Sequence, residues 1–361
     1  MFAVVMAGGQ GTRFWPESRR SKPKQFLNII GNETMIRKTI ERLLPIIPKE
    51  NIYAVVNESH LQETIGQTGL SDNIIMEPIG RNTAPCIGLA ALYIQRKDPE
   101  GVMVALPADH YIEDQEAFLK TILAAEETAL SKGYLVTLGT EPKYPATGFG
   151  YIEKGELLGK SGSKVYPDEG REFFKVKRFT EKPDITTATE FLADGNFLWN
   201  SGIFVWKVSA ILEQIKTHLP SLYDGLMKIR RAIGTNQERE AISEVYSNIE
   251  SISIDYGVME KSNIATVIPS DFGWNDVGSW ASLDEVLPKD KDGNVLIGKC
   301  ISLETKDTVV YGKDKLIATL GLDGIVVVDT GDAILISRKD KCQDVKKIVE
   351  RLEKEGMDEY L

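Results

Sequence analysis

The 361-residue sequence is poor in the residues that build disulfide frameworks and zinc sites. Its three cysteines, Cys86, Cys300 and Cys342, are odd in number and far apart. They form neither a disulfide framework nor a CxxC metal or redox motif, so we interpret them as buried free thiols. The three histidines show no HExxH spacing, so a structural zinc site is not expected.

Long apolar runs and basic clusters are also missing. No stretch approaches the roughly 20 apolar residues of a membrane span, and residues 1–6 lack the basic segment of a signal peptide. The formal net charge is -10, and no Lys/Arg run forms a footprint for nucleic acid. We therefore expect a soluble cytoplasmic protein that binds neither membranes nor nucleic acids.

What the sequence does contain is an alternation of short apolar runs and helix-period segments. At 361 residues the chain exceeds the roughly 250 to 300 residues that one hydrophobic core supports, so we expect two domains. Buried strands are predicted at residues 2–7, 52–56, 102–106 and 135–138, with helices between them. This alternation predicts an α/β fold with a Rossmann-like mixed, mostly parallel sheet flanked by helices, and ligands outside the carboxyl ends of its strands.

The pattern changes in the rest of the chain. Residues 144–179 predict an antiparallel hairpin, and residues 186–247 carry helix signals. A polar, turn-rich stretch at 287–293 predicts a boundary between a catalytic domain of residues 1–288 and a small β domain of residues 289–361. The β domain closes with an amphipathic helix.

A glycine loop follows the first strand directly. Residues 8–13 read Gly-Gly-Gln-Gly-Thr-Arg, and backbone N–H groups in such a loop can reach phosphate oxygens, although the loop can equally be a tight turn. Phe14 does not fit a dinucleotide fingerprint, and no Gly-Lys-Ser/Thr of a Walker A loop occurs. Arg13 and Lys24 add cations beside the loop and so favour phosphate binding.

Residues 8–27 carry a longer signature. Gly-Gly-x-Gly-x-Arg-x-x-Pro is followed by Pro-Lys-x-x-x, which resembles the sugar-phosphate nucleotidylyltransferases. The forms Phe-Trp-Pro and Pro-Lys-Gln-Phe-Leu are similar to the mannose-1-phosphate guanylyltransferase branch of that family, and the resemblance covers nearly the whole chain. It implies transfer of GMP from GTP to α-D-mannose 1-phosphate, which gives GDP-mannose and pyrophosphate. It also implies a left-handed β-helix-like C-terminal domain and a homodimer.

The resemblance implies a nucleotide site made of several segments. The glycine loop and Arg13 would hold the GTP phosphates, and Lys24 would help to neutralise their charge. Residues 81–85 resemble the segment beside the guanine base, although Asn82 and Pro85 also fit a plain helix cap and first turn. The implied nucleotide-binding residues are Ala7, Gly8, Gly9, Gly11, Thr12, Arg13, Asn82, Thr83, Pro85 and Asp109.

Two carboxylates are candidates for a metal site. Asp109 follows the predicted strand at 102–106, and Asp276 lies in the segment 273–280, Gly-Trp-Asn-Asp-Val-Gly-Ser-Trp. Either could be an ordinary turn former, and only the family resemblance pairs them. As a pair they would hold Mg²⁺, which completes its coordination with phosphate oxygens and water.

The resemblance also implies a hexose site. Glu181 and Asn200 would contact the sugar, Gly148 would approach it closely, and Lys182 would bind its phosphate. Without the resemblance, Glu181 and Lys182 would read as a surface ion pair. Sugar hydroxyls need paired acceptors and donors, which a carboxylate, an amide and exposed backbone supply.

The implied chemistry needs no protein nucleophile. Arg13, Lys24 and Lys182 would act catalytically by positioning two anions and neutralising their charge. The alternatives are the same reaction with glucose 1-phosphate, UTP or dTTP, a catalytically silent sugar-nucleotide sensor, and, least favoured, an NAD-dependent dehydrogenase. Some relatives carry a further isomerase domain, and isomerase activity is not expected here.

Overall fold

The computed structural model describes residues 1–162 and 170–361. The chain divides into two compact units. The first, which we call the sheet unit, comprises Met1–Gly8, Ile40–Ala108 and Ile112–Trp274. The second, which we call the glycine-loop unit, comprises Gly9–Thr39, Asp109–Tyr111 and Asn275–Leu361.

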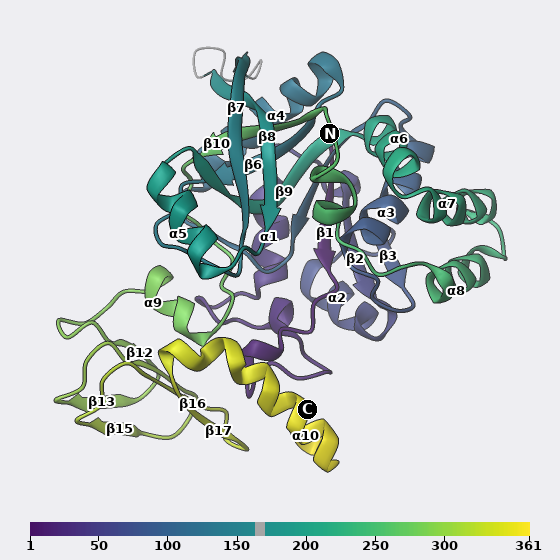
Figure 1. Ribbon diagram of the computed structural model, residues 1–361. Helices are drawn as coiled ribbons and strands as arrows, with labels where there is room; N and C mark the ends of the chain where they lie inside the picture. The colour runs from purple at the N-terminus through teal and green to yellow at the C-terminus, as the bar shows by residue number, and fades with distance from the viewer. Residues whose placement is uncertain (163–169) are drawn as a thin grey trace. The chain divides into compact units, whose positions relative to one another are not determined.

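A nine-stranded sheet forms the centre of the sheet unit (Figure 1), with the strand order β3-β2-β1-β4-β9-β6-β10-β8-β7. Its strands are β1 (Phe2–Ala7), β2 (Ile52–Asn57), β3 (Ile74–Glu77), β4 (Val102–Pro107), β6 (Leu135–Thr140), β7 (Gly150–Ser161), β8 (Arg171–Glu181), β9 (Phe197–Lys207) and β10 (Ala265–Ser270). Strands β3, β2, β1 and β4 run parallel, as do β6 and β10, while β9 is antiparallel to both β4 and β6. The predicted mixed, mostly parallel sheet is thereby confirmed.

Strand β9 corrects one sequence-based expectation. Residues 186–247 were expected to be helical, yet Phe197–Lys207 is a strand in the middle of the sheet. Its side chains are buried on both faces, so the periodicity of a half-exposed strand is lost. The expected antiparallel hairpin is confirmed, because β7 pairs with β8 along most of its length.

Helices pack on this sheet. The helix α3 contacts α6 and α7, and α7 contacts α8, so that these four gather together (Figure 1), while α4 packs against β4, β6, β9 and β10. The apolar side chains of α3, α6, α7 and α8 join those of the strands in one large core. The helices are α2 (Leu61–Thr68), α3 (Thr83–Lys97), α4 (Gln115–Lys132), α5 (Ile185–Asp194), α6 (Val208–His218), α7 (Pro220–Ala232), α8 (Glu238–Asn248) and a π-helix (Asp255–Met259).

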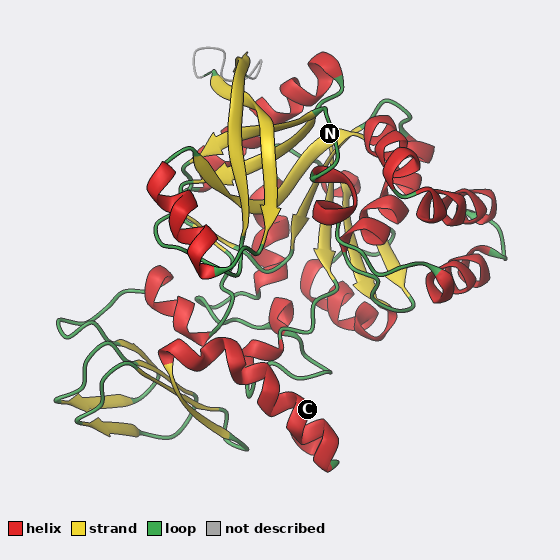
Figure 2. Cartoon of the chain, viewed as in Figure 1, coloured by secondary structure: helices red, strands yellow, loops and turns green. Residues whose placement is uncertain are grey.

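Short parallel strands characterise the glycine-loop unit (Figure 2). The strands β12, β14 and β16 pair in parallel, β13 pairs in parallel with β15, and β17 runs antiparallel to β16. This arrangement confirms a β-helix-like region that ends in a helix. Its elements are α9 (Leu283–Val286), β12 (Val295–Ile297), β13 (Cys300–Leu303), β14 (Val309–Gly312), β15 (Ile317–Leu320), β16 (Ile325–Asp329), β17 (Ile334–Arg338) and α10 (Lys346–Glu355).

The remaining elements lie where the chain passes from one unit to the other. Helix α1 (Met35–Leu43) spans such a boundary, and the short strands β5 (Tyr111–Ile112) and β11 (Trp274–Asn275) each lie at one. The two units therefore interleave in sequence, and a domain boundary at residue 288 stays a prediction. No helix within residues 1–162 or 170–361 combines the length and apolar character of a membrane span.

Candidate active site

Gly11 adopts a left-handed backbone conformation that favours glycine over other residues. Its φ is +64°, and a Cβ at this position would lie 2.4 Å from Cβ of Lys24. The Ser18 hydroxyl donates to the Gly11 carbonyl oxygen at 2.7 Å and so fixes the turn. A side chain at position 11 would displace Lys24. The exposed Gly9 has no atom within 4 Å of its Cβ position, which leaves its backbone accessible.

Lys24 is buried, and its ammonium group binds two distant segments. Its Nζ lies 2.9 Å from Oδ2 of Asp109 and donates at 2.8 Å to the main-chain carbonyl oxygen of Asp276. The same ammonium lies 5.5 Å from the centroid of the Phe14 ring. One cation therefore joins the two segments that carry the predicted metal ligands, all within the glycine-loop unit.

The pKa values of Asp109 and Asp276 are shifted in opposite directions. Burial disfavours the charged form of Asp109, but the charges of Lys24 and His110 outweigh this effect, so the pKa of Asp109 is lowered. Burial raises the pKa of Asp276, and the nearby charge of Asp109 adds to that effect while Lys24 and Arg13 oppose it. The pair therefore behaves as two carboxylates that share one cationic environment.

The backbone beside Asp276 is strained. Val277 has a φ of +47°, which is rare for a β-branched residue. Its N–H group donates to Oδ1 of Asn275 at 2.7 Å, and a Cβ on Gly278 would lie 2.7 Å from Oδ2 of Asp276. Strain of this kind concentrates at functional sites and here accompanies a carboxylate packed tightly against its own chain.

The carboxylates fit a cation that takes few protein ligands. Among residues 1–162 and 170–361, no group of three or more His, Cys, Asp or Glu side chains is placed to hold a metal ion. Asp109 and Asp276 offer two hard oxygen donors whose charges influence each other. This donor set suits Mg²⁺, since that ion fills its remaining positions with water and phosphate oxygens.

The start of α3 has the predicted cap. Asn82 adopts a φ of +70°, and its side-chain oxygen accepts from the Thr83 N–H group at 2.8 Å. The Thr83 hydroxyl oxygen in turn accepts from the Ile254 N–H group at 2.8 Å, and Ala84 N–H donates to the Ile252 carbonyl oxygen at 3.1 Å. The cap interpretation of Asn82 is confirmed, and Thr83 ties this segment to the entry of the π-helix.

Glu181 is the last residue of β8, and its carboxylate packs against the backbone of Gly150. Its side chain is 11% exposed, and the Lys182 ammonium, 57% exposed, lies 2.7 Å from its Oε1. A Cβ on Gly150 would lie 2.4 Å from Oε2 of Glu181, so a side chain at position 150 would shift this carboxylate. Gly148, which the sequence singled out, has no atom within 4 Å of its Cβ position.

Asn200 lies in a hydrogen-bond network that the sequence did not reveal. Its Oδ1 accepts from the Thr137 hydroxyl at 3.0 Å and from Gly202 N–H at 3.2 Å, and its Nδ2 donates to Oδ1 of Asp255 at 2.8 Å. Burial raises the pKa of Asp255 to about 7, and the charge of Glu181 adds to this effect. Asp255 had no signal in the sequence because a lone Asp before a helix is common.

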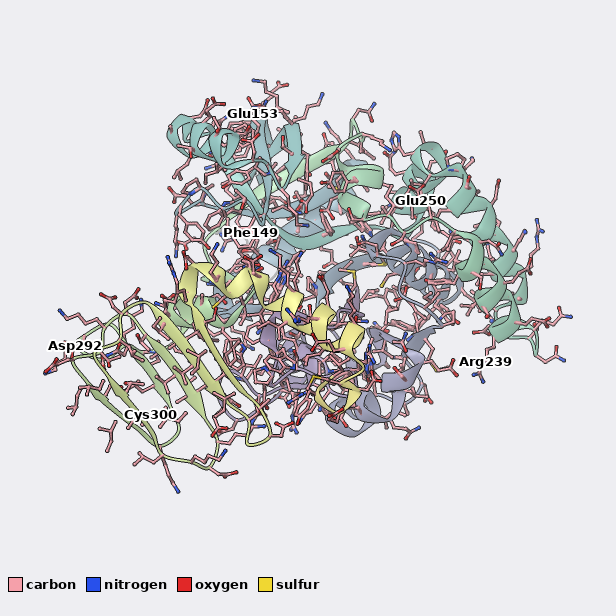
Figure 3. The ribbon with its side chains drawn as sticks, turned by 60° about the horizontal axis from the view of Figure 1, so that its bottom comes forward. Phe149, Glu153, Arg239, Glu250, Asp292 and Cys300 are labelled. Atoms are coloured by element: carbon pink, nitrogen blue, oxygen red, sulfur yellow. The ribbon has the colours of Figure 1, made fainter. Side chains whose placement is uncertain are left out.

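An aromatic cluster covers the neighbouring residues of β9. Trp199 makes edge contacts with Tyr144 and Phe149, both with ring centroids 5.0 Å apart, and Phe149 (Figure 3) contacts Trp274 at 5.3 Å. Tyr144 and Phe149 lie on either side of Gly148 in sequence, so both ends of this segment pack against Trp199. The rings give the segment a rigid apolar backing within the sheet unit.

Glu77 is a second carboxylate that sequence analysis missed. It ends β3, is buried, and accepts from the Tyr246 hydroxyl at 3.0 Å. Burial raises the pKa of Glu77 to about 7, against the effect of this hydrogen bond. Arg81 Nε donates to the Tyr246 carbonyl oxygen at 2.7 Å, so Glu77 belongs to the same framework as the predicted base segment.

The structure places the predicted residues in two groups. One group belongs to the glycine-loop unit and includes the Lys24, Asp109 and Asp276 cluster. Its members are Gly9, Gly11, Thr12, Arg13, Lys24, Asp109 and Asp276. The other group belongs to the sheet unit and consists of Ala7, Gly8, Asn82, Thr83, Pro85, Gly148, Glu181, Lys182 and Asn200.

Comparison with known proteins identifies the family of this chain. Residues 2–293 match the family model described as nucleotidyl transferase, and residues 298–352 match a MannoseP isomerase/GMP-like beta-helix domain. The chain is 39% identical to a mannose-1-phosphate guanylyltransferase of Salmonella muenchen, over 100% of this chain and 75% of the relative. The chain belongs to the mannose-1-phosphate guanylyltransferase family of nucleotidyl transferases.

Further relatives in this family share the whole length of the chain. A mannose-1-phosphate guanylyltransferase of Escherichia coli K12 is 40% identical over 100% of this chain and 75% of its own length. A solved Thermus thermophilus structure, titled a mannose-1-phosphate geranyltransferase, superposes with a TM-score of 0.85 at 35% identity, covering 98% of this chain and 99% of that one. The family thus accounts for both the sheet unit and the β-helix-like region.

Proposed function

We propose that this chain transfers GMP from GTP to α-D-mannose 1-phosphate and releases GDP-mannose and pyrophosphate. The observation that carries the proposal is the Lys24 ammonium, bound to Asp109 and to the Asp276 carbonyl beside the glycine loop. A buried cation and two carboxylates next to exposed loop backbone suit a triphosphate with its metal ion. Membership of the guanylyltransferase family supports guanine and mannose as the base and the sugar.

The chemistry joins two anions, so their repulsion is the main obstacle. The exposed Arg13 and the Lys24 ammonium neutralise the triphosphate, and Lys182 binds the phosphate of the attacking sugar. When bound by Asp109 and Asp276, Mg²⁺ supplies positive charge to the phosphate oxygens as a Lewis acid. No covalent protein intermediate is needed.

The hexose is held by the second group of residues. Glu181 accepts hydrogen bonds from sugar hydroxyls, Asn200 contributes its amide, and the backbone at Gly148 approaches the ring without obstruction. The segment from Asn82 to Pro85 lies beside the base. A homodimer and a cytoplasmic location complete the proposal.

A substrate matrix tests the function. The purified protein is incubated with each NTP and each of mannose, glucose and galactose 1-phosphate in the presence of Mg²⁺, and pyrophosphate release is followed. We expect the highest kcat/KM for GTP with mannose 1-phosphate. A preference for UTP or dTTP with glucose 1-phosphate would replace the specific assignment, and no release from any pair, with binding retained, would favour a silent sensor.

A further inference from the structure

The π-helix of the sheet unit presents a carboxylate that no assigned role uses. Asp255 is its first residue and is partly buried. Its side chain accepts from the neutral Asn200 amide at 2.8 Å, and in the described part of the chain it forms no ion pair with a cation. The nearby charge of Lys182 offsets only part of the cost of removing this carboxylate from water, so its position points to a functional role.

The network around Asn200 leaves its amide a single orientation. Oδ1 already accepts from the Thr137 hydroxyl and from Gly202 N–H, so only the NH₂ group can face Asp255. One N–H of that group is bound by Asp255, and within residues 1–162 and 170–361 the other has no protein acceptor. Asp255 completes this arrangement, because without its oxygen Asn200 is held through Oδ1 alone.

A hydrogen bond of the preceding residue, Ile254, fixes the position of Asp255. The N–H group of Ile254, one residue earlier, donates to the Thr83 hydroxyl oxygen, and Thr83 begins α3. Single-turn π-helices are rare and recur at functional sites, where they turn a side chain away from the regular helical path. Here the π-helix aims Asp255 at Asn200 from a segment 55 positions away.

Asp255 is also close enough to Glu181, the other side chain predicted to contact the hexose, for their charges to interact. The charge of Glu181 acts on Asp255, and the Tyr256 hydroxyl donates to the Glu181 carbonyl oxygen at 3.4 Å. Two carboxyl groups and one amide thus gather in the sheet unit, a set that offers several acceptors and a fixed donor to vicinal hydroxyl groups.

We propose that Asp255 is a positioning residue of the hexose site, which locks the Asn200 amide so that its free N–H and the Glu181 carboxylate together bind hydroxyls of the sugar ring. This inference rests on the proposed function. It adds a residue and a mechanism of sugar selection that neither the motifs nor the family comparison supplies.

Kinetics of matched variants test the inference. Asp255→Ala should raise KM for mannose 1-phosphate about tenfold or more while KM for GTP changes less than about twofold. Asp255→Asn keeps an oxygen that accepts from Asn200 and should recover most of the affinity. Glu250→Ala, which removes an exposed carboxylate five positions earlier (Figure 3), serves as the control and should change neither constant.

A double-mutant cycle distinguishes positioning from a general structural role. If Asp255 acts through Asn200, adding Asp255→Ala to Asn200→Ala should cause less than about a twofold further rise in KM for mannose 1-phosphate. Full additivity, equal losses of GTP and hexose phosphate affinity, or an unchanged KM in Asp255→Ala would each overturn the inference. Thermal melts verify that each variant is folded.

The inference and the proposed function can fail separately. If wild-type protein releases no pyrophosphate, the same variants are titrated with mannose, glucose and galactose 1-phosphate by calorimetry. A selective loss of hexose phosphate binding in Asp255→Ala would then uphold the positioning role although the reaction is wrong. If wild-type protein binds none of the three, both proposals are overturned.

Discussion

Lys24 shows what a single residue contributes to this protein. Its ammonium joins two segments that lie 85 and 252 positions away in sequence. The motif identified Lys24 as a cation beside a phosphate loop. The spacing of residues in the sequence does not predict that Lys24 binds Asp109 and the Asp276 carbonyl. The same holds for Glu77 and Asp255, whose pKa values near 7 arise from burial and not from any local pattern.

Removing the charge of Asp276 tests the metal site at this scale. Asp276→Asn keeps the main-chain carbonyl that binds Lys24 but removes one oxygen donor, so we expect kcat to fall at least about 100-fold at saturating Mg²⁺. Pyrophosphate release and a thermal melt measure activity and folding. The exposed Asp271→Asn is the control, and unchanged turnover in Asp276→Asn would defeat the metal role.

Glu77 makes stability depend on pH. Its folded-state pKa is about 7, above the ordinary value of 4.5, so the folded protein retains a proton that the unfolded chain loses. The contribution of Glu77 to the free energy of unfolding is therefore fully present below pH 4.5. It is lost as the pH rises through about 7, which lowers the free energy of unfolding by about 3 kcal/mol. Glu77→Gln should remove this loss, because Gln still accepts from Tyr246.

Urea unfolding at pH 5 and pH 8 measures this effect. The stability gain of Glu77→Gln over wild-type protein should be greater at pH 8 than at pH 5 by about 2 kcal/mol. The exposed Glu190→Gln should show no such difference. A gain that is equal at both pH values would mean that Glu77 is not the group responsible.

At the scale of elements, the sequence predicted most of the fold. Strands β1, β2, β4 and β6 were predictable because each is a short run of mostly buried apolar residues. The strand β9 was missed because it is buried on both faces and lies between helices. Its pairing with strands β4, β6 and β7 depends on contacts across the sheet, which no local pattern encodes.

The sequence predicted only those site residues that lie in recognisable motifs. The glycine loop, Asp109 and Asp276 came from sequence signatures, and the structure brings Lys24 together with both aspartate segments. Gly150, which leaves room for Glu181, was not distinguished from Gly148 two positions earlier. Only the packing of β7 against β8 separates their roles.

The glycine loop yields a prediction about stability. Gly11→Ala places a Cβ 2.4 Å from Cβ of Lys24 at a φ of +64°, so we expect a loss of about 2 kcal/mol and a lower melting temperature. Gly9→Ala, two positions earlier, meets no atom within 4 Å and should melt close to wild-type protein. Equal melting temperatures for the two variants would show that the loop relaxes around Lys24 without cost.

The whole molecule exposes apolar side chains on its β-helix-like region. Ile301 and Leu303 on β13 and Leu320 on β15 are 52%, 61% and 69% exposed, and Leu303 pairs in register with Leu320. The strand β13 also contains Cys300 (Figure 3). Contiguous exposed apolar side chains of this kind mark interaction surfaces, which supports a homodimer through this face.

Light scattering tests the dimer. Wild-type protein should elute as a particle of about 80 kDa, twice the chain mass of 40.1 kDa. The double variant Leu303→Glu/Leu320→Glu should elute as a monomer, while Leu157→Glu, at a leucine on β7 that is 50% exposed, should not. A wild-type monomer would remove the homodimer from the proposal.

The interleaving of the two units has a consequence for biosynthesis. The glycine loop is made among the first 39 residues, but most of the rest of its unit, including the Asp276 carbonyl that binds Lys24, lies in residues 275–361. The sheet unit has all of its strands once Trp274 has been made, so it can fold while the ribosome is still adding the last quarter of the chain. The sheet unit, with its large apolar core, would therefore form before the contact between Lys24 and the Asp276 carbonyl, and a chain stalled near residue 274 would lack that contact.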